Sequence, residues 1–170
     1  ICFFFHNLFL TISKSLFVHF STIKLLVQPF KISYNPINLN FNTTEDYEMN
    51  IIATDKAPGA IGPYSQGYEV NGVVYTSGQI PVNPATGEIP EGIAAQADQS
   101  CKNVGAILEA AGSGYDKVFK TTCFLAEMAD FAAFNEVYAK YFTSKPARSC
   151  VAVKDLPKGV LCEIEAIAVK

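Results

Sequence analysis

The feature that most restricts the fold is the pair of apolar stretches near the C-terminus. Residues 150–153 (Cys-Val-Ala-Val) are apolar at both odd and even positions. The second stretch has the same property at Ile164, Ala166, Ile167 and Ala168. Successive side chains of a strand point to opposite faces of its sheet. These stretches therefore predict strands that are covered on both faces.

The remaining elements predict an α+β fold. Asn71-Gly72 separates two β-prone runs, and this dipeptide is typical of a type I′ hairpin. Apolar residues at helical spacing predict a helix over 93–111, with Gly112 at its end, and Asp130 can cap a second helix. The predicted strands are Tyr68–Val70, Val73–Ser77, Val118–Ala126, Arg148–Val153 and Cys162–Val169. This order predicts a mixed sheet with two helices on one face. The open face then needs a cover, and we expect an oligomer.

One compact domain accounts for the chain after Met49. Residues 1–48 contain no glycine and are rich in Phe, Leu, Ile, Asn, Ser and Lys, and the composition changes abruptly at residue 49. Neither apolar stretch of this segment is an uninterrupted membrane span, and it lacks the arginines of a mitochondrial presequence. We therefore expect residues 1–48 to be disordered or an artefact of the gene model, and residues 49–170 to form the domain.

The residue inventory excludes several classes of chemistry. Both histidines, His6 and His19, precede the domain, which excludes histidine triads, histidine bases and histidine metal ligands from it. The net charge of −3 argues against non-specific nucleic-acid binding. The five cysteines form no CxxC pair, so we expect reduced thiols in a cytoplasmic protein.

Arg148 is the only arginine, and it follows Pro146 at the start of a predicted strand. A guanidinium in a rigid position suits a ligand carboxylate, which it can bind through two parallel hydrogen bonds. The alternative is a structural ion pair with Glu163 or Glu165. These two glutamates share one strand face, where a carboxylate can orient a water molecule or take its proton. The alternative for them is a solvated strand face.

Three further positions are weaker candidates. Cys150 lies on the same strand face as Arg148, which would lower the pKa of its thiol, but without a histidine base a packed or pocket-lining thiol is the simpler interpretation. Tyr64 follows the stiff pair Gly62-Pro63 and either faces a ligand or anchors its loop. Ser77-Gly78 offers backbone N–H groups to an anion, but the signal is short.

Five segments in order resemble the RidA (YjgF) family of reactive-intermediate deaminases. They are Gly62-Pro63-Tyr64-Ser65-Gln66, Ser77-Gly78-Gln79, Asn135-Glu136-Val137-Tyr138, Pro146-Ala147-Arg148-Ser149 and Glu163-Ile164-Glu165-Ala166-Ile167-Ala168. The resemblance covers residues 49–170, so residues 1–48 lie outside the family pattern. Cys162 departs from it, since the family usually has a branched aliphatic residue there.

The resemblance implies a chorismate-mutase-like fold assembled as a homotrimer with ligand clefts between subunits. It implies hydrolysis of 2-aminoacrylate and 2-aminocrotonate, through their 2-imino acid tautomers, to 2-oxo acids and ammonia. Pyridoxal-phosphate-dependent dehydratases release these compounds. The reaction needs neither a metal nor a cofactor, because an imine is already activated toward water.

The resemblance also implies roles for individual residues. Arg148 would hold the substrate carboxylate, Glu163 would position the attacking water, and Cys150 would contact the substrate through its backbone. Tyr64, Ser77, Gly78 and Asn135 would line the cleft.

Two other functions remain open at this stage. Members of the family are linked to RNA cleavage and inhibition of translation, although an acidic domain with one arginine is poorly suited to bind phosphates. The second is a non-catalytic or chaperone-like trimer that binds 2-oxo acids. The compartment also stays open, since a mitochondrial location would follow if the extension is real.

Overall fold

The computed structural model describes residues 48–170, so the predicted extension lies outside the described residues except for its last position. The strands are β1 (Met49–Ile52), β2 (Gly67–Val70), β3 (Val73–Thr76), β4 (Val118–Leu125), β5 (Ala147–Ala152) and β6 (Cys162–Val169). The helices are α2 (Ile93–Ala110) and α3 (Phe131–Tyr141), with short 3₁₀ turns at Tyr115–Lys117, Met128–Asp130 and Pro157–Gly159.

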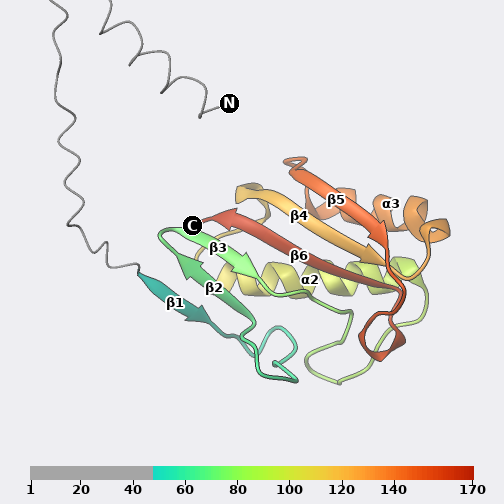
Figure 1. Cartoon of the computed structure of the whole chain (residues 1–170), viewed down its shortest axis with the longest axis horizontal. Helices are drawn as coiled ribbons and strands as arrows, with labels where there is room; N and C mark the ends of the chain where they lie inside the picture. The colour runs from blue at the N-terminus through green and yellow to red at the C-terminus, as the bar shows by residue number, and fades with distance from the viewer. Residues whose placement is uncertain (1–47) are drawn as a thin grey trace, which may run out of the picture. The chain divides into compact units, whose positions relative to one another are not determined.

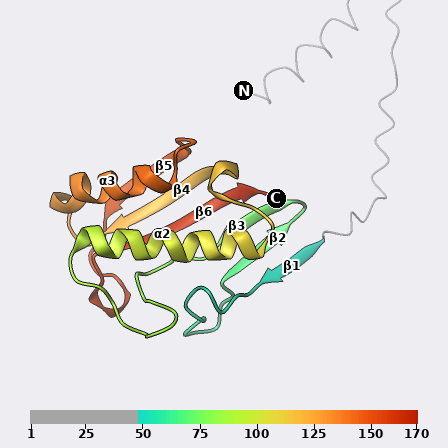
Figure 2. The ribbon, with the colours of Figure 1, turned by 180° about the vertical axis from the view of Figure 1, so that it is seen from behind.

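The strands form one mixed sheet in the order β1-β2-β3-β6-β4-β5. Only β4 and β5 are parallel, and every other neighbouring pair is antiparallel. Figures 1 and 2, taken from opposite sides, show both helices on the same face of this sheet. The predicted α+β fold, with two helices on one face of a mixed sheet, is confirmed. β5 forms one edge of the sheet, and this position matters for the site.

The hairpin between β2 and β3 follows directly from two residues. Asn71 and Gly72 adopt φ angles of 51° and 78°, which are the left-handed conformations that a type I′ turn requires. Asparagine and glycine tolerate this conformation best. The turn fixes the register of the hairpin, with Val70 opposite Val73 and Gly67 opposite Thr76. β3 ends at Thr76, one residue before the predicted boundary.

Helix α2 matches its prediction to within one residue. Gly112 has φ 77°, and the N–H groups of Gly112 and Ser113 donate to the carbonyls of Glu109 (3.0 Å) and Leu108 (2.8 Å). Such bonds satisfy the last carbonyls of a helix, and glycine accepts the left-handed backbone at low cost. Gly112 therefore ends the helix, as expected.

The start of α3 differs from the prediction. Asp130 precedes the helix, but its side chain makes no capping hydrogen bond. Its φ and ψ of −80° and −7° are helical, because a 3₁₀ turn over Met128–Asp130 leads directly into α3. A capping side chain needs an extended backbone to reach back to the first N–H groups. The predicted cap by Asp130 is therefore wrong, although the helix is present.

Strand β1 was not predicted. Met49–Ile52 pairs antiparallel with β2, with Ile52 opposite Gly67, and Ile52 is buried while Met49 and Ile51 are exposed. The four residues carry no clear alternation of polar and apolar side chains. Pairing with the edge of the hairpin, rather than local propensity, makes this segment a strand.

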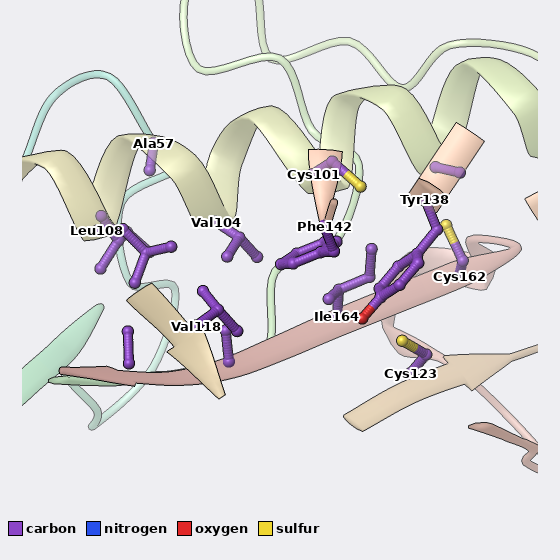
Figure 3. Close-up of a cluster of buried hydrophobic side chains, with 14 of the residues drawn as sticks. Ala57, Cys101, Val104, Leu108, Val118, Cys123, Tyr138, Phe142, Cys162 and Ile164 are labelled. Carbon is purple, nitrogen blue, oxygen red and sulfur yellow. The ribbon is translucent and has the colours of Figure 1, made fainter. Parts of the chain in front are cut away.

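The core lies between the sheet and the two helices. Figure 3 shows side chains of α2, β4, β6 and α3 gathered in this layer. The fully buried members include Cys101, Val104, Leu108, Cys123, Phe134, Cys162 and Ile164. Burial raises the pKa of the Cys123 and Cys162 thiols to about 12, so both are neutral packing groups. Cys101 is a core residue, as expected.

The opposite face of the sheet has no cover within one chain. Ile51, Tyr68, Tyr75, Val151 and Val169 are between 38% and 64% exposed. Val74 and Ala168, which alternate with Tyr75 and Val169 along β3 and β6, are buried beneath the helices. The exposed side chains therefore point to the face away from the helices. These exposed apolar side chains are consistent with the prediction that the strands are covered on both faces. None of the helices in residues 48–170 has the length and hydropathy to span a membrane.

Candidate functional site

A cavity of about 440 Å³ opens on the face of the sheet away from the helices. Its lining comprises Ile61, Tyr64, Ser77, Gly78, Ile80, Pro157, Glu163 and Glu165. Four of the predicted site residues, namely Tyr64, Ser77, Gly78 and Glu163, therefore lie together. They come from the loop before β2, the segment after β3, and β6.

Gln66 holds the loop that carries Tyr64. Its buried side chain accepts a hydrogen bond from the Thr54 N–H (2.7 Å) and donates to the carbonyls of Thr54 (2.9 Å), Ala57 (3.1 Å) and Pro58 (2.8 Å). The side-chain amide of Gln66 thus satisfies backbone N–H and C=O groups of the loop that have no partner in a helix or strand. The motif Gly62 to Gln66 is therefore a ligand-facing loop with its own internal anchor.

Tyr64 faces the cavity rather than the core. Its side chain is 49% exposed, and its hydroxyl accepts a hydrogen bond from the Ile61 N–H at 3.3 Å. The alternative of a buried loop anchor is wrong. Ser77 sits opposite, where its hydroxyl donates to the Ser65 carbonyl (2.6 Å) and its N–H donates to the Gln66 carbonyl (2.9 Å). The Ser77 N–H is therefore engaged and does not point to an anion.

Gly78 lies directly against the carboxylate of Glu163. A Cβ atom built on Gly78 would overlap Glu163 Oε1 and lie 2.7 Å from its Cδ. The next residue, Gln79, forms a backbone bridge to Ile164, with bonds of 2.8 and 3.2 Å. This bridge fixes the distance between the two segments. Only glycine fits here while Glu163 keeps this rotamer, so the close approach explains the Ser77-Gly78 motif.

The two glutamates of β6 face the cavity together, as predicted. Both are partly buried, whereas Cys162, Ile164 and Ala166 point into the core. Burial raises the pKa of the Glu163 carboxyl, and the nearby charge of Glu165 raises it further. Neither carboxylate forms an ion pair with a described residue. This strand face is therefore half-buried within one chain.

Arg148 lies in a different place, at the edge strand β5. Its Nη1 donates to Asn135 Oδ1 at 2.8 Å, and its guanidinium carbon lies 4.7 Å from the ring centre of Tyr138 and 5.5 Å from that of Phe131. These three residues occupy successive turns of α3, on one face of the helix. They fix the guanidinium from one side and leave most of its five N–H donors for a ligand.

Cys150 follows Arg148 on the same strand face. It is register partner to the buried Cys123, and it packs against the core. Burial raises the pKa of the Cys150 thiol, and the opposing effect of Arg148 is smaller. The suggestion that Arg148 activates this thiol is therefore wrong, and Cys150 is a neutral side chain at the edge of the core.

The predicted site residues thus form two groups within one chain, and these groups lie on opposite faces of the sheet. Arg148 pairs with Thr121, and Thr121 pairs with Ala166, so the three side chains share the helix-covered face. Glu163 lies three residues before Ala166 on β6, and side chains an odd number of residues apart on a strand point to opposite faces. Glu163 therefore points to the open face. Among the described residues Arg148 therefore forms no ion pair with Glu163 or Glu165, and that alternative is wrong.

Comparison with known proteins explains the pattern of motifs. The family model described as Endoribonuclease L-PSP matches residues 54–170. The chain belongs to this family, the RidA (YjgF) family. A 2-iminobutanoate/2-iminopropanoate deaminase of Escherichia coli is 55% identical over 123 residues, which cover 70% of this chain and 96% of that protein. A RutC family protein of Haemophilus influenzae is 55% identical over 125 residues, covering 71% and 96%.

Solved structures of the RidA family support the fold. The crystal structure of the YjgF gene product from E. coli has a TM-score of 0.69 and 54% identity, and it covers 71% of this chain and 98% of its own. The crystal structure of E. coli TdcF with bound serine has a TM-score of 0.69 and 52% identity, covering 71% and 98%.

Sequence reasoning missed the residues that hold the RidA motifs in place. Phe131 and Tyr138 stack on Arg148, and their spacing of four and three residues from Asn135 places all three on one helix face. The sequence shows this helical spacing, but it does not show that Arg148 of β5 packs against this helix face. Gln66 gave no signal beyond its place in a motif. Among residues 48–170, no group of three or more His, Cys, Asp or Glu side chains is arranged to hold a metal ion.

Proposed function

We propose that this RidA-family chain is an imine deaminase that hydrolyses reactive enamine and imine intermediates to 2-oxo acids and ammonia. Its substrates would be 2-aminoacrylate and 2-aminocrotonate, as their 2-imino acid tautomers. The observation that carries the proposal is the fixed guanidinium of Arg148, combined with a partly buried Glu163 in a separate, open cavity. The relatives named as deaminases support the choice of substrate class.

Arg148 suits the carboxylate that all these substrates carry. The stacking on Tyr138 and the bond to Asn135 hold the guanidinium in one orientation before a ligand arrives. A preorganised guanidinium loses little entropy when it binds a carboxylate through two parallel hydrogen bonds. Each charge-assisted bond contributes about 1.5–3 kcal/mol where it is sheltered from water.

Glu163 suits the other end of the substrate. An imine carbon is electrophilic without a metal or cofactor, so the protein needs only to orient a water molecule and to move protons. The Glu163 carboxyl group lies beside Gly78 and in the same cavity as Tyr64 and Ser77. Tyr64 and Ser77 supply polar groups that can fix a small substrate in the cavity.

A homotrimer would unite the two halves. Because Arg148 and Glu163 lie on opposite faces of one sheet, a complete site needs the two residues from different subunits. The exposed Tyr68, Tyr75 and Val151 of the open face provide an apolar surface for such an assembly. Arg148 is on the edge strand β5, where a neighbouring subunit can reach it. We infer three clefts per trimer, each with Arg148 from one subunit and Glu163 from the next.

The two remaining functions fit the site less well. Endoribonuclease activity, which the family description names, would require cations for several phosphates along an RNA chain, but Arg148 is the only arginine and the net charge is −3. A trimer that only binds 2-oxo acids or acts as a chaperone would use Arg148, but it gives no role to Glu163. Loss of turnover without loss of 2-oxobutanoate binding in Glu163→Gln separates enzyme from binding protein.

The decisive experiment adds the protein to a pyridoxal-phosphate-dependent threonine dehydratase reaction and follows ammonia and 2-oxobutanoate. We expect faster release of both products with the wild-type protein and no acceleration with Arg148→Ala. Lys120→Ala is the matched control, because it removes another cation of the sheet, whose Nζ donates a hydrogen bond to Ser149 Oγ. Equal rates with and without the wild-type protein would exclude the deaminase activity for this substrate.

A further inference from the structure

A second, smaller cavity of about 170 Å³ adjoins the one that contains Glu163 and Glu165. A ligand in the larger cavity can extend into the smaller one, because the two share part of their lining. The shared residues are Ile61, Tyr64, Gly78 and Ile80. Most of the remaining lining is apolar or glycine, and among the described residues that line the smaller cavity Lys158 is the only one with a charged side chain.

The wall of the smaller cavity between β3 and α2 is held in place by the fold. Asn103, which is buried on α2, donates hydrogen bonds to the carbonyls of Ile80 (3.0 Å) and Val82 (2.9 Å). The next residue, Asn83, donates its N–H to the Glu88 carbonyl at 2.9 Å, which closes the loop on itself. A cavity whose walls are fixed in advance binds a ligand at a lower entropic cost.

Lys158 reaches this cavity from a turn with an unusual backbone. The turn Pro157–Gly159 gives Lys158 a φ of 58° and a ψ of 14°, in the left-handed region. A residue other than glycine adopts this conformation at a cost, and such residues are concentrated at functional sites. Pro157 lines the larger cavity, so the turn borders both cavities. Neither of the ion pairs within residues 48–170 involves Lys158, which leaves its ammonium group for a ligand.

We propose that the smaller cavity is a side-chain pocket, in which Lys158 binds a carboxylate at the far end of the substrate side chain. The substrates then include 2-imino dicarboxylic acids, besides the short 2-imino acids of the proposed function. The reaction is the same hydrolysis, in which one imine and one water give one 2-oxo acid and one ammonia. This inference rests on the proposed deaminase function and names a further substrate class for the same cleft.

The size of the smaller cavity suits this substrate class. A volume of about 170 Å³ has room for about five non-hydrogen atoms, since one water molecule takes up about 30 Å³ in the liquid. A side chain of two methylene groups and a carboxylate has this size. Its methylene groups contact apolar lining residues such as Val82 and Pro84, and its carboxylate lies beside Lys158.

The charges around the cleft suit two separate carboxylates. Arg148 of the neighbouring subunit binds the carboxylate next to the imine carbon, and Lys158 binds the distal one. Glu163 and Glu165 line the larger cavity only, and no described residue that lines the smaller cavity is acidic. The ammonium group of Lys158 attracts a carboxylate and repels a cationic side chain. The pocket therefore disfavours imines of basic amino acids.

Binding of the 2-oxo acid products tests the pocket without requiring turnover. 2-Oxoglutarate has the distal carboxylate and 2-oxobutanoate lacks it, so calorimetry with the full-length protein compares the two. We expect the preference for 2-oxoglutarate to fall about fivefold in Lys158→Met, between the effect of an exposed ion pair and that of a sheltered charge-assisted bond. Lys158→Arg keeps the charge and should keep the preference. Lys154→Met is the matched control, since this exposed lysine lines neither cavity.

Turnover provides the second measurement. L-Glutamate oxidase, with catalase to remove peroxide, supplies 2-iminoglutarate, and threonine dehydratase supplies the four-carbon imine. The ratio of kcat/KM for 2-iminoglutarate to that for the four-carbon imine should fall about fivefold in Lys158→Met, in parallel with the binding preference.

The two measurements separate this inference from the proposed function. A wild-type protein that does not bind 2-oxoglutarate, or a folded Lys158→Met protein with the wild-type preference, overturns the pocket even if the protein is an active deaminase. A selective loss of 2-oxoglutarate binding in Lys158→Met, in a protein without deaminase activity, upholds the pocket and overturns only the proposed reaction.

Discussion

Arg148 and Glu163 point to opposite faces of one sheet, although the two residues lie only two strands apart. The register that passes from Arg148 through Thr121 to Ala166 fixes this relationship, because Glu163 and Ala166 point in opposite directions on β6. No rotamer change brings a side chain through a hydrogen-bonded sheet. A site that uses both residues must therefore be shared between chains.

Subunit mixing tests this directly. Arg148→Ala and Glu163→Gln should each be inactive alone, but co-assembly of equal amounts should restore about a quarter of wild-type activity, because random pairing gives one cleft in four with both native residues. Ammonia release after co-expression and size-exclusion chromatography measures it. Mixing Arg148→Ala with the double variant is the control. Complete inactivity of well-assembled mixed oligomers would place both residues in the same chain's site.

Gly78→Ala should impair catalysis without unfolding the protein. The new methyl group overlaps the Glu163 carboxylate, which must rotate away from the cavity. A displacement of this size at a reacting group lowers kcat/KM by about tenfold or more. Gly59→Ala is the matched control, since a Cβ there has no neighbour within 4 Å. If both variants keep wild-type kcat/KM, the contact between Gly78 and Glu163 has no functional role.

The fold was largely predictable, because it depends on local signals. Asn71-Gly72 fixed the hairpin and Gly112 fixed the end of α2, and each acts through its own backbone conformation. β1 and the start of α3 escaped prediction for the opposite reason. β1 exists through pairing with β2, and Asp130 does not cap α3 because a 3₁₀ turn leads directly into the helix and gives Asp130 a helical backbone.

The site was predictable in composition but not in arrangement. The motifs named Tyr64, Ser77, Gly78 and Glu163, which line one cavity, although the close approach of Gly78 to Glu163 was not predicted. Strand order decides which faces they share, and a sequence does not state that β6 lies between β3 and β4. The resemblance implied clefts between subunits, but the assignment of Arg148 and Glu163 to opposite faces, and the stacking of Arg148 on α3, emerged only from the three-dimensional structure.

Gln66→Ala should cost about 2–3 kcal/mol of the free energy of unfolding, because it leaves the N–H of Thr54 and several carbonyls of residues 54–58 without partners. Urea unfolding measures this loss. Gln99→Ala is the control, since that side chain is only partly buried and donates one bond to Asn103. An equal effect of the two substitutions would show that the loop does not depend on Gln66.

The environment of Glu69 predicts that the folded protein loses stability in acid. Its pKa is lowered by hydrogen bonds from Asn50 and from the Gly72 N–H, with a smaller contribution from Lys170. A carboxyl with a lowered folded-state pKa adds stability above its ordinary pKa of 4.5, and this stability is lost as the pH falls through the folded value. Tm should therefore drop less between pH 7 and pH 3 in Glu69→Gln than in the wild type. Parallel Tm curves for the two proteins would contradict the linkage.

Cys150→Ala separates a structural thiol from a nucleophile. Burial raises the pKa of this thiol despite the nearby Arg148, so the reactive thiolate is disfavoured at neutral pH. We expect kcat/KM to fall by less than about tenfold, as for a small volume change at the edge of a core. Removal of a true covalent nucleophile costs on the order of 10⁶-fold in a serine protease. Steady-state ammonia release, with Arg148→Ala as the inactive reference, decides between the two, and a loss as large as that of the reference would make Cys150 part of the chemistry.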